Sequence, residues 1–320
     1  MRSNAGVILR SAIAALLLFV LVRAVDPADL AGLWTSVQLG WVAGAVAILV
    51  GIRILMAVRW RYILLPHGVH ARLSDIIAII FISTSAGYLL PGGGFGVDVY
   101  RGYQLSRLYG SVPKVSATIV VDRVIGLYSM VFLALVGVLL VGDGALHRGL
   151  VLMLYLVNGG FLIGMLVLLL WEDQLKGMFG WLLGRMPRFL TPFEVFAHAL
   201  MDSKLFRQVL PGIFGVSILV QLLRAVVFYM IYRSLGADPG LGIMLAYIPL
   251  VFIVILMPIS LGGLGVRELA LQFFLAGHGL DMAINLSAGL MFHALEVVVA
   301  LPGVYFFLVQ SREPREKISL

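Results

Sequence analysis

The chain has 320 residues, of which 61% are hydrophobic and only 12% are charged, and its mean hydropathy is +1.05. Soluble domains are about 45–50% apolar, so the composition excludes an ordinary soluble protein and predicts an all-α polytopic membrane protein. The absence of cysteine excludes disulfides, thiol nucleophiles and thiolate metal sites. The formal net charge of +7 comes with basic residues in short loops between apolar stretches, which indicates membrane orientation and no nucleic-acid partner.

The N-terminal region, residues 1–37, is predicted to hold a first span at 7–22 and an external loop. Arginines before this span favour a cytoplasmic N-terminus. A second span is expected at about 38–58 and contains Arg53. It leads into residues 59–72, a basic and aromatic segment that we interpret as a cytoplasmic loop at the level of the lipid headgroups.

The next apolar stretch, residues 75–90, is short for a spanning helix of about 20 residues. It runs into the first glycine loop, residues 89–98, where a proline and four glycines interrupt the apolar sequence. Basic residues follow, so residues 75–110 are predicted to form a re-entrant hairpin. Asp98 is expected to cap the second half of that hairpin.

Two further spans complete the first half, at about 115–141 and 150–171. The first of these contains the adjacent pair Asp122 and Arg123. We interpret 38–171 as repeat 1 and the long polar stretch 172–207 as a cytoplasmic or interfacial linker.

The second half, residues 208–311, repeats this order as repeat 2. A span at about 209–235 contains Arg224, a second re-entrant hairpin is expected at 240–277, and a last span follows at about 283–309. The basic tail, 312–320, is predicted to be cytoplasmic.

The two halves share a motif, because Gly93, Gly94, Gly96 and Val97 match Gly262, Gly263, Gly265 and Val266. The leading spans of the halves run in opposite directions, which predicts two inverted repeats with about six full spans and two hairpins, or ten spans if every hairpin leg crosses. Interruptions at corresponding places of two halves indicate a transporter's binding site. The expected hinge residues are Pro91, Gly93, Gly94, Gly96, Pro258, Gly262, Gly263 and Gly265.

Ionisable residues inside or beside the spans are the candidate substrate-binding residues, because such groups are costly in a membrane and usually face the interior or water. They are Arg53, Asp98, Arg101, Asp122, Arg123, Arg224, Arg267, Glu268 and Glu296. Arginine binds phosphate through two parallel hydrogen bonds, and the start of a half-helix adds unpaired N–H groups. An anion with an apolar body fits this set, although internal ion pairs that tie helices together explain the same residues.

No catalytic motif, metal-ligand spacing or cofactor loop stands out, so the chain is predicted to be neither an enzyme nor dependent on a metal or cofactor. His67, His70 and Asp75 in the basic segment leave open an interfacial glycosyl or acyl transferase.

Several segments carry a family resemblance: residues 90–93 (Leu-Pro-Gly-Gly), 96–101 (Gly-Val-Asp-Val-Tyr-Arg), 122–127 (Asp-Arg-Val-Ile-Gly-Leu) and 258–268. Over about residues 10–310 the chain resembles the transmembrane region of lysylphosphatidylglycerol synthases. The resemblance implies a flippase that moves a lipid between leaflets of a bacterial inner membrane. The 320 residues leave no room for the soluble aminoacyl-transferase domain, so we do not expect synthesis of the lysyl lipid.

The sequence therefore predicts a lipid translocase that moves an anionic phospholipid or a lipid-linked headgroup, with a membrane lipid as partner and with homo-oligomers as a further expectation. An ion-coupled transporter of a small soluble anion and an interfacial transferase remain the alternatives.

Overall fold

The structure, a computed structural model, describes residues 2–89, 93–142, 148–170, 204–257 and 259–310. Two of the expected hinge residues, Pro91 and Pro258, lie outside these ranges, as do most of the expected linker 172–207 and the tail 312–320. The described elements are α1 (Arg2–Arg23), α2 (Pro27–Thr35), α3 (Leu39–Leu64), η1 (Leu65–His67), α4 (Leu73–Leu89), α5 (Gly93–Tyr109), α6 (Val112–Val141), α7 (Arg148–Leu170), α10 (Lys204–Ser234), α11 (Leu241–Ile255), η3 (Leu261–Gly263), α12 (Val266–Leu275), η4 (Ala276–His278) and α13 (Met282–Gln310).

The chain is a multi-pass membrane protein. Four of the described helical segments are long and apolar enough to cross a bilayer: Leu39–His67, Val112–Val141, Gln208–Ser234 and Met282–Leu308. A fifth candidate is the N-terminal pair of helices α1 and α2, which meet at an angle of 93°. The four long segments coincide with the second, third, fifth and last spans expected from the sequence.

Helix α3 extends further than expected, and this corrects the interpretation of residues 59–72. It continues to Leu64, so residues 59–64 are helical rather than part of a loop, and the side chains of Arg59 and Trp60 are buried inside the protein. The Trp60 indole N–H donates to the Thr118 hydroxyl of α6 at 3.1 Å. This end of α3 is therefore part of the packed interior.

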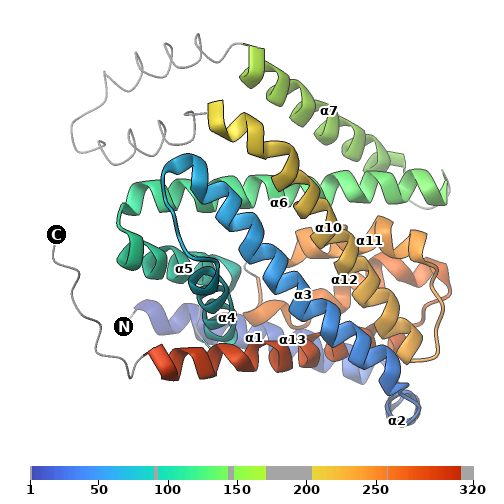
Figure 1. Cartoon of the computed structure of the whole chain (residues 1–320). Coiled ribbons are helices and arrows are strands. Elements are labelled where there is room, and N and C mark those ends of the chain that lie inside the picture. The colour runs from blue at the N-terminus through green and yellow to red at the C-terminus, as the bar shows by residue number, and fades with distance from the viewer. Residues whose placement is uncertain (1, 90–92, 143–147, 171–203, 258, 311–320) are drawn as a thin grey trace.

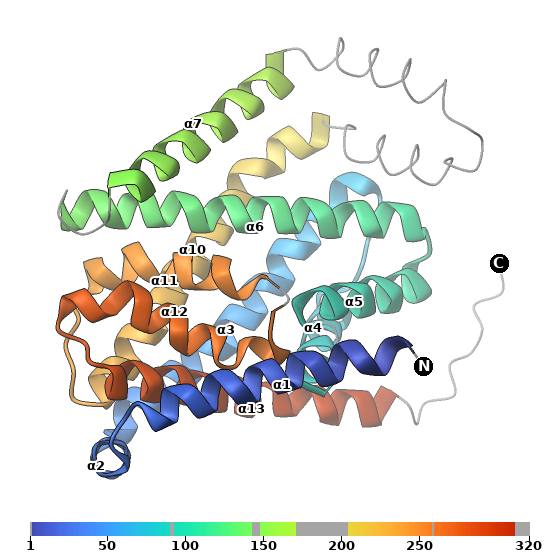
Figure 2. The same cartoon turned by 180° about the vertical axis from the view of Figure 1, so that it is seen from behind.

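The helices are arranged in crossed pairs. Helices α6 and α13 run along opposite sides of the molecule, with α4, α5, α11 and α12 between them, and α3 and α10 cross together over one face (Figures 1 and 2). Helix α11 packs along α6, and α4 packs along α13. The first and second halves of the chain are thereby interleaved.

Both of these contacts depend on a glycine. A Cβ atom at Gly137 of α6 would collide with the backbone of Ala246 on α11, and one at Gly303 of α13 would collide with the carbonyl of Phe81 on α4. Small residues let membrane helices approach closely enough for dense packing, which is a main source of their association in lipid. The two glycines therefore determine how closely the halves pack.

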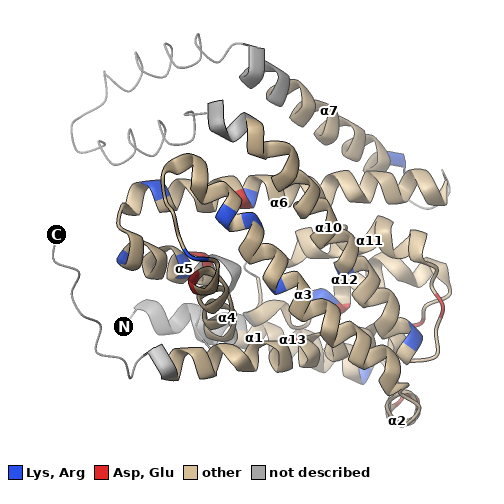
Figure 3. Ribbon diagram, in the orientation of Figure 1, with Lys and Arg blue, Asp and Glu red and all other residues tan. Residues whose placement is uncertain are grey.

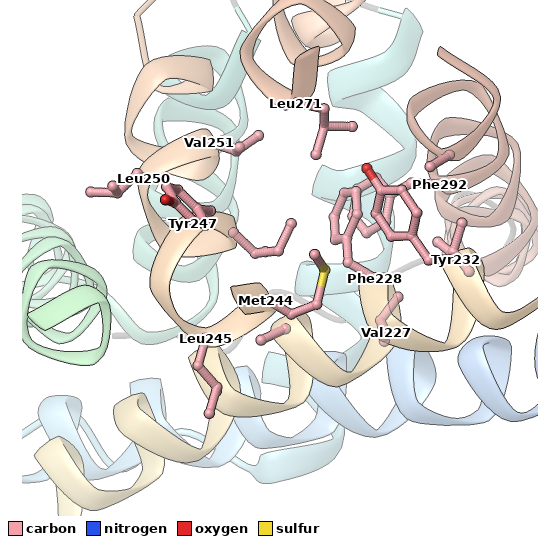
Figure 4. Packing of buried hydrophobic residues seen from close by; sticks show 14 of the residues in the cluster. Val227, Phe228, Tyr232, Met244, Leu245, Tyr247, Leu250, Val251, Leu271 and Phe292 are labelled. Carbon is pink, nitrogen blue, oxygen red and sulfur yellow. The ribbon is translucent and has the colours of Figure 1, made fainter. Parts of the chain in front are cut away.

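The main core is built mostly by α10, α11, α12 and α13, with residues of α3 and α6 beside them, and it contains several aromatic rings (Figure 4). The rings of Phe228 and Phe292 stack with their centroids 4.6 Å apart. The Tyr232 hydroxyl donates to the side-chain oxygen of Asn285 at 2.8 Å, so this buried phenol has a partner. This core supports the helices that carry the second glycine loop.

Helices α4 and α5 occupy the range expected for the first hairpin and pack against each other. Their far ends are joined by Tyr109, whose hydroxyl donates to Asp75 at 2.5 Å and accepts from the Arg72 N–H at 3.0 Å. Asp98 is not a helix cap, because α5 already begins at Gly93 and Asp98 lies within it.

Candidate functional site

A cavity of about 1050 Å³ lies between helices α3, α4, α5, α6, α10, α11 and α13 and the turn η3. It is lined mostly by apolar side chains with a group of charged and amide side chains among them. These polar residues are Arg53, Arg59, Asp98, Arg101, Asp122, Arg123, Gln221, Arg224 and Glu296. Seven of the nine expected binding residues are thus brought to one cavity.

Three arginines and two aspartates form a continuous chain of ion pairs along one wall. Arg59 contacts Oδ1 of Asp122 through Nε and Nη2, both at 2.8 Å, and Arg101 contacts Oδ2 of Asp122 through Nη2 at 2.9 Å. Arg101 Nε lies 2.9 Å from Oδ1 of Asp98, whose Oδ2 accepts from Arg123 Nε. Charged segments of α3 and α6 lie side by side in Figure 3 at the Arg59–Asp122 contact.

Arg123 is the most accessible member of this chain. Its side chain is 40% exposed, whereas the side chains of Arg101 and Arg59 are 5% and 6% exposed. The buried members contact one another through both aspartates, and the half-exposed side chain of Arg123 lines the cavity at the end of the chain. An incoming anion would therefore meet Arg123 before the other two arginines.

A second charged group lies on α3, α10 and α13. Arg53 forms an ion pair with Oε2 of Glu296. In the described part of the chain Arg224 forms no ion pair; its Nη1 donates to Oε1 of Gln221 at 3.2 Å, and its guanidinium lies 4.8 Å from the ring centre of Phe252. Arg224 therefore contributes a positive charge to the cavity that has no described carboxylate within ion-pair distance.

The second glycine loop contributes backbone to the cavity through Gly262 and Gly263. Gly262, Gly263 and Gly265 have φ angles of 62°, 76° and 77°, which favour glycine. The first loop is different, since Gly93, Gly94 and Gly96 already belong to α5. Two motifs with matching glycines thus adopt different backbones.

Arg267 and Glu268 do not line the cavity, unlike the other expected binding residues. Arg267 Nη2 donates to the Gly262 carbonyl at 3.2 Å, and its guanidinium lies 4.9 Å from the ring centre of Phe292. Glu268 Oε2 accepts from the Gly265 N–H at 2.6 Å, at the beginning of α12. Both side chains therefore support the loop from behind.

Two lining residues were missed by sequence reasoning, Arg59 and Gln221. Arg59 was assigned to a loop because it belongs to a basic and aromatic cluster. Its spacing gave no signal, since six residues along a helix place Arg53 and Arg59 about 120° apart; only the contact with Asp122 identifies Arg59 as an interior residue. Gln221 is three residues before Arg224 on α10, a spacing that places two side chains on one helix face.

Part of the cavity wall is apolar and exposed at the protein surface. We call this the apolar rim: Val99 and Tyr103 of α5 with Val120, Val124 and Leu127 of α6. All five side chains are at least 39% exposed. In a bilayer such side chains face acyl chains, which are as apolar as the rim itself.

Two of the three residues of the transferase alternative have structural partners, and the third, His70, is exposed. His67 is buried, and its Nδ1 lies 2.8 Å from the Ile63 carbonyl. Asp75 accepts the hydrogen bond from Tyr109. Among the described residues, no three His, Asp or Glu side chains come together as metal ligands.

Comparison with protein families matches residues 7–303 to the lysylphosphatidylglycerol synthase transmembrane region. The matched range contains every residue that lines the cavity. Comparisons with curated proteins and with solved structures gave no match.

Proposed function

Since the chain belongs to the family of the lysylphosphatidylglycerol synthase transmembrane region, we propose that it is a lipid translocase that moves an anionic phospholipid or a lipid-linked headgroup between leaflets. The observation that carries this proposal is the combination of an arginine-lined cavity with an apolar rim. The arginines bind the phosphate, and the acyl chains leave the cavity over the rim and stay in the bilayer.

The rim favours a lipid over a small soluble anion. A site for a soluble ion gains nothing from exposed valine and leucine side chains at its opening, whereas acyl chains lose no apolar contacts when they lie there. The arginines meanwhile replace the hydration of the phosphate with charge-assisted hydrogen bonds, which are about twice as strong as neutral ones.

We further propose that the two halves are inverted repeats. The crossed packing supports this, since the first hairpin helix of each half, α4 or α11, packs along the helix that follows the hairpin of the other half, α13 or α6. Gly137 and Gly303 take equivalent parts in the two contacts. A symmetric pair of contacts of this kind allows one half to rock against the other around a central site, as in other inverted-repeat transporters.

The proposal also covers the membrane in which the protein lies, its orientation and its mode of action. The protein acts in a bacterial inner membrane with both termini in the cytoplasm, as the arginine and lysine distribution favours. It moves its lipid without a chemical step, cofactor or metal. A membrane-impermeant thiol reagent added to intact cells should label a single cysteine at residue 277, an exposed position, and should not label one at residue 61; the native chain has no cysteine of its own.

The proposal is tested by reconstitution into liposomes with phosphatidylglycerol carrying a fluorescent acyl chain, followed by quenching of the outer leaflet. The wild-type protein should accelerate loss of the protected fluorescence. Arg123→Gln should slow it by roughly ten- to a hundredfold, because a charged hydrogen bond contributes about 1.5–3 kcal/mol.

The matched control is Arg61→Gln, which changes an exposed arginine of the same helix bundle outside the cavity. It should transfer lipid at the wild-type rate. Transfer at the wild-type rate by Arg123→Gln, or uptake of inorganic phosphate without any lipid transfer, would contradict the proposal.

A further inference from the structure

We propose that the headgroup carried by this protein has a phosphate as its only charged group, and that a headgroup with an ammonium group is excluded. This inference rests on the proposed function and concerns the same cavity. It separates this chain's substrate from the aminoacylated lipid in the family's name. Which headgroups the cavity can bind depends on which of its carboxylates and aromatic rings already have partners.

The carboxylate oxygens of the two cavity aspartates already contact arginines, which leaves none to pair with an ammonium group. Both oxygens of Asp122 contact arginines, Oδ1 with Arg59 and Oδ2 with Arg101. Both oxygens of Asp98 do so as well, with Arg101 and Arg123. A cationic headgroup would have to displace a guanidinium from a buried, two-sided ion pair.

The third lining carboxylate is also engaged, because Glu296 is ion-paired with Arg53. Both side chains are only 10% exposed. Separating them to admit an amine would leave a guanidinium without its partner in the protein interior, which is strongly unfavourable. Thus none of the three carboxylates is available as a counter-ion.

Aromatic faces are the other usual site for an organic ammonium group, and two of those at the cavity already face arginines. The ring of Phe252 on the cavity wall faces the guanidinium of Arg224 at 4.8 Å. The ring of Trp60, behind the wall, faces Arg101 at 4.9 Å. Arginine thus occupies two of the aromatic faces at the cavity, and the ring of Tyr103 lies on the exposed apolar rim, away from the carboxylates of the interior.

The balance of charge points the same way. Five arginines and three carboxylates line the cavity, which leaves a formal net charge of +2. Arg224 provides one of these charges without an ion-pair partner among the described residues. The negative charge of a phosphodiester reduces this excess to +1, whereas each ammonium group of a headgroup raises it again and places like charges together.

The experiment compares four lipids with the same fluorescent acyl chain in the same liposomes. Phosphatidylglycerol and phosphatidic acid carry no ammonium group, whereas phosphatidylethanolamine and lysylphosphatidylglycerol do. We expect the first two to cross at similar rates and the last two to cross at least roughly tenfold more slowly, because juxtaposed like charges oppose binding.

The outcomes separate the two proposals. Lysylphosphatidylglycerol that crosses as fast as phosphatidylglycerol would overturn the inference and leave the translocase function standing. No transfer of any of the four lipids would overturn the proposed function and the inference with it.

The residue that should set this selectivity is Arg224. Arg224→Gln lowers the net charge of the cavity to +1 without removing a partner from a carboxylate, so the rate for lysylphosphatidylglycerol relative to phosphatidylglycerol should rise. Arg224→Lys keeps the charge and should keep the wild-type ratio. An unchanged ratio in Arg224→Gln would contradict the charge argument; if that variant fails to insert, the wild-type lipid comparison still decides.

Discussion

Arg59 of α3 holds one oxygen of Asp122 of α6 through two guanidinium nitrogens, each at 2.8 Å. The pair joins residues that are 63 positions apart in the sequence. It begins the chain of ion pairs that ends at the accessible guanidinium of Arg123. Arg59 thus supports the proposed phosphate site from its buried end.

Replacing Arg59 with glutamine should lower the stability of the protein in detergent by about 3–5 kcal/mol, because it leaves a buried carboxylate short of a partner. Asp122→Asn in the same chain should restore part of the loss. Melting temperature is the measurement, and Arg61→Gln on the exposed side of the same helix is the control. A melting temperature of Arg59→Gln equal to that of the wild type would place this arginine in contact with water.

The ion pair between Arg53 and Glu296 links α3 to α13 and can be measured by a double-mutant cycle. Arg53→Gln and Glu296→Gln should each destabilise the protein, and the double variant should be more stable than the sum of the two losses predicts. The coupling energy is expected to be about 0.5–3 kcal/mol. Strict additivity of the two melting shifts would mean that the pair contributes nothing to folding.

The glycine contacts between the halves predict a steric effect. Gly137→Leu and Gly303→Leu should each destabilise the protein by at least about 1–3 kcal/mol, since an added side chain meets backbone that has no flexible end to move. Gly159→Leu on α7 is the matched control, because no atom lies within 4 Å of a Cβ built there. Normal melting of both core variants would show that the helices separate without cost.

Tyr109 predicts a pH effect at the end of the α4–α5 hairpin. Burial, and then the hydrogen bond to Asp75, raise the pKa of the Tyr109 phenol above its ordinary value of 10.0. Its contribution to stability should be complete below pH 10 and should fall as the pH rises further, because the unfolded chain releases the proton first.

Tyr109→Phe should therefore lose roughly 1.5 kcal/mol at neutral pH and show a weaker decline of melting temperature above pH 10. Tyr62→Phe, at an exposed tyrosine, serves as the control. An alkaline decline of the same steepness in Tyr109→Phe and in the wild type would assign the effect to other groups.

Much of the architecture could be predicted because the membrane imposes strong rules on a sequence. Apolar length identified the four long helices. The cost of ionisable groups in a membrane identified seven cavity residues, from Arg53 to Glu296, since such groups must face an interior or water. Neither rule depends on knowing which helices touch.

The predictions from sequence were wrong where the position of a residue depends on contacts between segments that are distant in the sequence. In a sequence, a basic and aromatic cluster at a helix end looks the same whether it forms a loop or continues a buried helix. The partner of Arg59, Asp122, cannot be identified from a single sequence. Likewise, proximity to the glycine loop did not specify that Arg267 and Glu268 lie behind it. The matching glycines themselves gave no sign that one set would be helical and the other left-handed.

The interleaving of α4 with α13 and of α11 with α6 has a consequence for biosynthesis. When the ribosome has completed α6, neither α4 nor α6 has yet met its main partner, and α4 waits until the last helix is made. The first half must therefore remain in the bilayer as loosely associated helices, because the contacts that complete it are of long range and form late. A gene cut between the halves should yield two fragments that are each degraded when expressed alone and that accumulate when they are produced together.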